Sequence, residues 1–127
     1  MKTSAIIIAL GGVLSFGVQG VFAGCYGSGD SWPNVEEARS FVSDACHKSG
    51  GMFTGNFEPR QTKSMCPRSG SRSLGLLFEV QNLNTNTGFD LGNNDCYEKL
   101  TSLIFDCGRG GDSVVAGWRF RADPGAC

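Results

Sequence analysis

The clearest pattern in the chain is a large apolar residue at every second position of one central segment. Over residues 74–81 these positions are Leu74, Leu76, Phe78 and Val80. A period of two is typical of a half-buried strand. Residues 116–121 repeat the pattern, with Trp118 and Phe120 on one face, and predict a closing strand. Two shorter runs, residues 52–57 and 61–65, flank a turn at residues 58–60 and predict a hairpin.

Two other segments carry apolar residues at the spacing of an amphipathic helix. In the first, Asn34 is a good N-cap, and Glu36 and Glu37 suit the positive end of the helix dipole. Its apolar face consists of Val35, Ala38, Phe41, Val42, Ala45 and Cys46. Gly50 and Gly51 are predicted to end this helix.

The second helix is predicted to begin at Asn94 as its N-cap, with Asp95 and Glu98 in the first turn. Its buried face consists of Cys96, Leu100, Leu103, Ile104 and Cys107. The expected order of elements is therefore α-β-β-β-α-β. This order predicts an α+β fold, in which two helices pack on a four-stranded, mostly antiparallel sheet. No linker is long enough to divide domains, so residues 24–127 are expected to form one domain.

The first 23 residues have the pattern of a signal peptide. A positive charge at Lys2 precedes an apolar stretch at residues 5–16, and residues 21–23 provide the small-residue site, so cleavage is expected after Ala23. The apolar stretch is short for a membrane span. Residues 22–25 can also be interpreted as a lipid-attachment box, but lipidation of Cys25 would leave an odd thiol. We therefore expect a secreted, extracellular protein.

Six cysteines lie downstream of this leader, an even number that predicts a disulfide framework in an exported chain. Each bond typically contributes about 2–4 kcal/mol. When the chain is traced alternately up and down through the predicted elements, the two helices run parallel. That tracing favours the pairs Cys46–Cys107, Cys96–Cys127 and Cys25–Cys66. Six cysteines allow about fifteen connectivities, so the pattern alone leaves the pairing open.

The charge balance excludes some partners. The chain has 11 Lys and Arg and 12 Asp and Glu, and removal of Lys2 with the leader makes the rest slightly more acidic. A nucleic-acid-binding protein normally has a basic excess, so we expect no nucleic-acid partner. After the leader, no segment is long and apolar or strongly basic and amphipathic, so stable membrane insertion is not expected. We expect a monomer.

Enzymatic signals are sparse. His47 is the only histidine, and its place at the end of the first helix suits a capping cation. Nucleophile-elbow, zinc-protease and phosphate-loop motifs are absent from the sequence. Asp90, Asn93, Asn94 and Asp95 form an oxygen-rich cluster without the spacing of a calcium loop, and helix capping explains its last two members. We therefore expect a protein that is not an enzyme and that uses no metal or cofactor.

Aromatic residues are the more informative candidates for binding. Tyr26, Trp32, Tyr97 and Trp118 have rings that can stack on the faces of sugars, while neighbouring polar groups hydrogen-bond the hydroxyls. For Trp118 the alternation with Phe120 favours a place in the core. Trp32 directly precedes the first helix, so it can instead act as a hydrophobic staple.

A set of basic residues is the second binding candidate. Its members are Arg60, Lys63, Arg68, Arg72, Arg119 and Arg121. The two C-terminal arginines alternate with Trp118 and Phe120, so they are expected on the opposite face of the closing strand. Such residues are usually solvated positions. As one face, they would suit an acidic glycan or a partner protein.

The spacing of cysteines, glycines and core residues resembles that of small secreted fungal proteins. The C-terminal pattern runs from Asp95-Cys96 through Leu100, Leu103-Ile104 and Cys107-Gly108 to Gly117-Trp118, Asp123-Pro124 and Cys127. The N-terminal part adds Cys25-Tyr26, Ser28-Gly29, Trp32 and Ala45-Cys46. Together they are similar to the family named for a mushroom glycan-binding protein, and more distantly to the necrosis-inducing effector domain of plant-pathogenic fungi.

The resemblance implies a secreted, non-enzymatic α/β protein of a filamentous fungus. Such a protein would act as a lectin or as a virulence effector, and its partner would be an extracellular glycan or a host protein. A cell-death-inducing or killer-type toxin is the alternative hypothesis, and a small secreted hydrolase is the third. The resemblance is carried by structural residues, so it predicts fold better than ligand.

Overall fold

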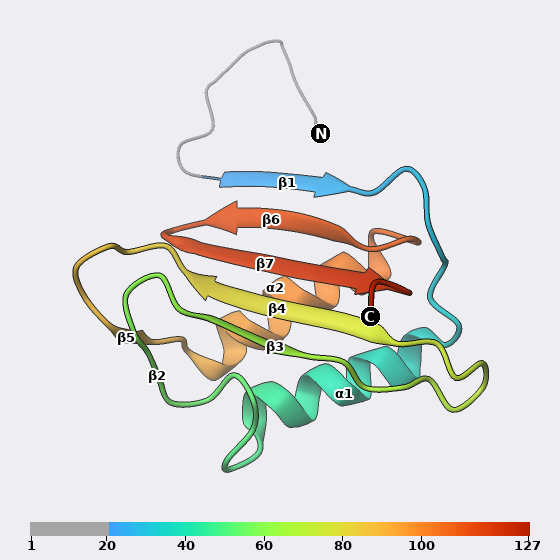
Figure 1. Cartoon of the computed structure of the whole chain (residues 1–127), viewed down its shortest axis with the longest axis horizontal. Helices are drawn as coiled ribbons and strands as arrows, with labels where there is room; N and C mark the ends of the chain where they lie inside the picture. Colours follow the sequence, from blue (N-terminus) through green and yellow to red (C-terminus); the bar gives the residue numbers. More distant parts are fainter. Residues whose placement is uncertain (1–20) are drawn as a thin grey trace, which may run out of the picture.

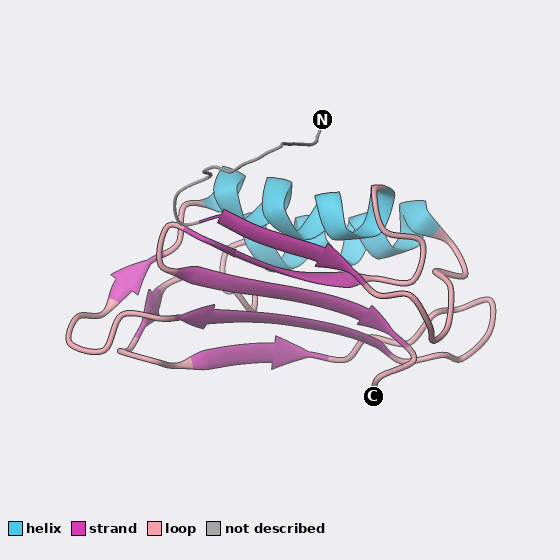
Figure 2. Ribbon diagram, turned by 90° about the horizontal axis from the view of Figure 1, so that it is seen from above, coloured by secondary structure: helices cyan, strands magenta, loops and turns pink. Residues whose placement is uncertain are grey.

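The structure, a computed structural model, describes residues 21–127. It has two layers: an antiparallel sheet, and two helices that both lie on one face of that sheet (Figures 1 and 2). The helices are α1 (Val35–His47) and α2 (Asn93–Phe105). Most of the predicted leader, residues 1–20, lies outside the described residues. The expected α+β class with two helices is confirmed.

The main sheet has five strands in the order β1-β6-β7-β4-β3. Their bounds are β1 (Val21–Cys25), β3 (Thr62–Met65), β4 (Leu76–Asn82), β6 (Gly111–Val115) and β7 (Trp118–Pro124). A separate two-stranded sheet joins β2 (Asn56–Phe57) to β5 (Phe89–Asp90). The strand order matches Figure 1, where β7 lies at the centre between β6 and β4.

The sheet differs from the expected one in strand number and in order. The strand expected at residues 52–57 is reduced to the two residues of β2, which pair with β5 and form no hairpin with β3. The closing strand begins at Trp118, because Ala116 and Gly117 form the turn from β6. β6 and β1 are strands that the periodicity did not predict. The observed order is β-α-β-β-β-β-α-β-β.

The two helices differ in how they begin. The Asn34 side chain caps α1 as expected, since its Oδ1 accepts a hydrogen bond from the Glu37 backbone N–H at 3.0 Å. The prediction that Asn94 caps α2 is wrong, because the N-cap is Gly92, two residues earlier, and Asn94 lies inside the helix. Asp95 is in the first turn of α2, where a carboxylate stabilises the helix dipole.

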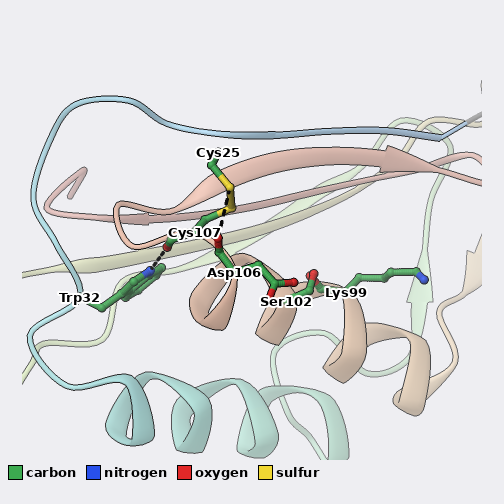
Figure 3. Close-up of a disulfide and its surroundings, with 6 residues drawn as sticks. All are labelled: Cys25, Trp32, Lys99, Ser102, Asp106 and Cys107. Atoms are coloured by element: carbon green, nitrogen blue, oxygen red, sulfur yellow. Dashed lines mark hydrogen bonds between the residues drawn. A yellow bond between two sulfur atoms is a disulfide. The ribbon is translucent and has the colours of Figure 1, made fainter. Parts of the chain in front are cut away.

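The core lies between the helices and the sheet. Four phenylalanines, Phe53, Phe57, Phe78 and Phe120, are at most 1% exposed. Trp32 belongs to this core. Its ring stacks on Phe78 with the centroids 5.6 Å apart, and its Nε1–H donates a hydrogen bond to the Cys107 carbonyl at 2.9 Å (Figure 3). The indole therefore fixes the segment before α1 to the segment after α2.

All six cysteines are in disulfides, as expected, but the predicted pairing is wrong in every bond. The observed pairs are Cys25–Cys107, Cys46–Cys96 and Cys66–Cys127. The error arises because residues 52–57 do not cross the sheet. The chain therefore crosses the main sheet one time fewer than expected between the two helices, and α1 and α2 run antiparallel. The end of α1 meets the start of α2 at the Cys46–Cys96 bond. The close contact of Trp32 with Cys107 fixes the opposite ends of the helices.

Candidate functional site

The face of the sheet opposite the helices carries paired charges. Arg119 of β7 donates two hydrogen bonds to the Asp112 carboxylate of β6. Arg121 lies 3.4 Å from the Glu79 carboxylate and 2.9 Å from that of Asp123. The hydrogen bonds with Asp112 raise the pKa of Arg119. Neighbouring carboxylates therefore balance both arginines, and the strand face is not a strongly basic surface.

Tyr26 joins this network from the segment that follows β1. Burial raises the pKa of its phenol, and a hydrogen bond with Arg121 opposes that shift. For Arg121, burial works to lower the pKa of the guanidinium, but the hydrogen bonds that it donates to Asp123 and Tyr26 outweigh burial and raise that pKa. Both side chains are thus held by partners within the chain.

The remaining basic candidates do not lie beside these arginines. Lys63 pairs with Val80 in the sheet register, so its side chain lies on the helix side, where Nζ is 4.1 Å from the Phe57 ring centroid. Its ammonium also donates a hydrogen bond to the Thr54 carbonyl at 2.9 Å. Arg60 is exposed in the turn before β3, and Arg68 and Arg72 are exposed in the loop before β4. The structure therefore does not bring the six basic residues together into one face.

The aromatic candidates also separate. Trp32 is only 8% exposed, so its indole serves the core and is not available to a ligand. Tyr97 is partly buried on α2, with its ring 5.3 Å from that of His47. Trp118 is partly buried at the start of β7. Its ring packs edge to face with the Phe57 ring, with the two centroids 5.0 Å apart. Among the four rings, Trp118 lines two pockets at the end of the sheet.

Two adjacent pockets share Trp118 and Ala116. The first, of about 320 Å³, is lined by Asp90, Leu91, Gly92, Asp95, Lys99, Val115, Ala116, Trp118 and Phe120. The second, of about 290 Å³, is lined by Asn82, Asn84, Phe89, Ala116, Gly117 and Trp118. We call the two together the Trp118 groove. It lies at the end of the sheet where β4 stops, β7 starts and α2 begins.

The two pockets differ in chemistry. The first is lined by the charged residues Asp90, Asp95 and Lys99 together with apolar residues. Carboxylates accept hydrogen bonds and an ammonium donates them, so this pocket can bind several hydroxyls. The second pocket is amide-lined, and its wall includes the Phe89 ring, which is 46% exposed. An exposed aromatic ring provides a surface for stacking.

Asn82 fixes the wall of the second pocket. This residue is 1% exposed, and its Nδ2 donates hydrogen bonds to the carbonyls of Phe57, Glu58 and Thr87 at 3.0–3.3 Å. Its Oδ1 accepts one from the Asn84 backbone N–H at 2.9 Å. A single side chain therefore joins the end of β4 to β2 and to the loop that leads to Phe89. A wall held in this way is preorganised for a ligand.

The hairpin turn between the pockets is strained. Ala116 and Gly117 have φ values of 51° and 85°, as in the type I′ turn of a two-residue hairpin. An L-residue in this region costs about 1–2 kcal/mol, and Asn or Gly adopts it more easily. We expect Ala116→Gly to raise the free energy of unfolding by about 0.5–1 kcal/mol, measured by urea denaturation. Gly117→Ala is the matched control and is expected to lower it. An unchanged or lower stability of Ala116→Gly would contradict the turn assignment.

Sequence reasoning missed half of this site. The sequence does not indicate Phe89 or Lys99 as binding residues, and it offers Asp90 for a metal site and Asp95 for a metal site or for helix capping. It offers Trp118 as a stacking ring but favours a place in the core. The alternation with Phe120 did place the Trp118 ring on the helix side of β7. The available signal was the Ala-Gly pair before Trp118, because a two-residue turn leaves the first residue of a strand at the rim of the sheet.

Within residues 21–127, no helix is long and apolar enough to cross a membrane. The same residues hold no cluster of three or more His, Cys, Asp or Glu side chains suited to a metal ion. No protein-family model matches the chain, and no curated protein is significantly similar to it.

Proposed function

We propose that this protein is a secreted, non-enzymatic binding protein that recognises carbohydrate through the Trp118 groove. The observation that carries the proposal is the partly buried Trp118 ring, which lines two adjacent pockets that each combine apolar and polar side chains. Sugar rings have apolar C–H faces and polar edges. A site that combines an aromatic ring with convergent acceptors and donors meets both requirements.

Charge decides which glycans suit this groove. Asp90 and Asp95 outnumber Lys99 in the first pocket, so the pocket is weakly acidic. Acidic sugars would bring like charges together there, whereas neutral hydroxyls can donate to both carboxylates. The paired state of Arg119 and Arg121 removes the surface that would have favoured an acidic glycan. The proposed ligand is therefore a neutral glycan.

Secretion is the second part of the proposal. The signal-peptide pattern of residues 1–23 supports it, and so do three disulfides in a chain of this size. Disulfides persist in oxidising spaces outside the cytosol. A protein exported into such a space can meet glycans of cell walls and of host surfaces.

The test is binding of the oxidised protein to an array of neutral and acidic glycans, followed by titration of the glycans that bind. We expect saturable binding of neutral glycans, and a loss of affinity of about tenfold or more in Trp118→Ala. Phe105→Ala is the matched control, because Phe105 is 50% exposed and does not line the groove. An array without neutral ligands, or equal affinities of the two variants, would refute the proposal.

A further inference from the structure

The Trp118 groove has two compartments rather than one. Both pockets include Trp118 and Ala116, and each adds residues that the other lacks. Asp95 and Lys99 of α2 line only the first pocket, whereas Asn84 and Phe89 line only the second. The two volumes are nearly equal, about 320 and 290 Å³, so neither pocket is a minor extension of the other.

We propose that the groove binds a linear neutral oligosaccharide, with one sugar unit in each pocket and the linkage beside Trp118. This inference rests on the proposed function and adds the length of the ligand. A single sugar can occupy only one pocket and contact one set of polar groups. A chain of two or more units can use the carboxylates of the first pocket and the Phe89 ring of the second at once.

The boundary between the pockets supports a continuous ligand. It is formed by the turn residue Ala116 and the Trp118 ring, both of which face each pocket. Ala116 is exposed and has a small side chain, so it leaves room for a ligand to extend from one pocket to the other. The indole is partly buried and packs against Phe57, which fixes its orientation. A linkage can therefore cross at Ala116 while the sugars lie against the indole.

Both sides of the groove are fixed before a ligand arrives. The first pocket is held by α2, whose first turn is tied to α1 through the Cys46–Cys96 disulfide. The second is held by the hydrogen bonds of the buried Asn82 side chain. Since neither wall must become ordered on binding, contacts with the second sugar unit add directly to affinity.

The test measures affinity against ligand length. The probes are neutral oligomers of one to six units in three series, built from glucose, mannose and N-acetylglucosamine, titrated by calorimetry and by amide chemical shifts. We expect the best series to gain about tenfold in affinity between one and three units. The trisaccharide should shift the amides of Lys99 and Asn84, one from each pocket.

Two variants test the two pockets separately. Asp95→Asn changes only the first pocket and Phe89→Ala only the second, and each should weaken trisaccharide binding about tenfold, with Phe105→Ala as the control. Affinity that does not depend on length, or an effect of only one of the two variants, overturns the two-pocket inference and leaves the proposed function intact. If no neutral sugar binds at any length, the proposed function fails and the inference fails with it.

Discussion

Replacing Asn82 with aspartate is expected to lower the free energy of unfolding by about 3 kcal/mol at neutral pH. The asparagine is 1% exposed, and its Nδ2 donates to three backbone carbonyls. A carboxylate has the same shape but no N–H to donate. The change therefore removes this donor from all three carbonyls, of which Glu58 keeps the Gln61 backbone N–H, and places a negative charge against them, away from water.

The same variant should be most defective at high pH. Because carbonyl oxygens surround the introduced carboxyl, its charged form is disfavoured and its pKa in the folded protein rises above the ordinary value of about 3.9. Above that ordinary value the folded state holds a proton that the unfolded state has released. The free energy of unfolding, relative to the wild type, therefore falls as pH rises from about 4 until it passes the raised pKa.

The matched control is the same change at Asn84. That residue is exposed, and its Oδ1 accepts hydrogen bonds from the N–H groups of Asn86 and Thr87 at 2.9 and 2.7 Å. Aspartate keeps this acceptor, so Asn84→Asp should change stability by less than about 0.5 kcal/mol. Urea unfolding of both variants between pH 4 and 8 measures the difference. Equal stabilities of the two would show that the Asn82 amide does not hold the wall.

Local periodicity predicted the elements whose burial repeats along the chain. The helix that begins after Asn34 and the strand around Phe78 each have a single apolar face, so spacing alone identifies them. β6 has no such face. Its sequence is Gly-Asp-Ser-Val-Val, and its place in the sheet is set by pairing with β1 and β7, which only the assembled chain provides.

The error in the disulfides followed from one misassigned segment. Residues 52–57 have the composition of a strand, yet only Asn56 and Phe57 pair, because the Phe53 backbone N–H donates to the Ala45 carbonyl of α1 at 3.0 Å and so holds the first part of the segment at the end of that helix. A tertiary hydrogen bond of this kind has no signature in local sequence. Because the chain crosses the sheet one time fewer, α2 runs in the opposite direction to the expected one, and all three cysteine pairs change with it.

The site was harder to predict than the fold because its residues come from separate segments. Asp95 and Lys99 lie on α2, Phe89 on β5, and Trp118 on β7. None of these positions is unusual in its own segment. They become a groove because β7 runs down the centre of the sheet and begins beside the first turns of α2.

Removing the Cys46–Cys96 disulfide, through Cys46→Ala with Cys96→Ala, is expected to have the largest effect on stability. The bond closes a loop with a sequence separation of 50, for which chain entropy alone gives about 4 kcal/mol. Both cysteines are 1% exposed between the helices, so the loss of their sulfur atoms also leaves a cavity in the core. Domains of this size are stable by about 5–15 kcal/mol, so the variant should be close to unfolding at 37 °C.

The control is the double variant Cys66→Ala with Cys127→Ala. That bond has a similar sequence separation, 61, but both of its residues are exposed. The entropy terms of the two bonds are therefore nearly equal, and the difference between the variants reports the packing of the buried sulfurs. Thermal unfolding should place the melting temperature of the core variant below that of the control. Because Cys96 follows Asp95 in the first turn of α2, only the core variant should also weaken binding in the Trp118 groove. Equal melting temperatures would show that this disulfide acts through chain entropy alone.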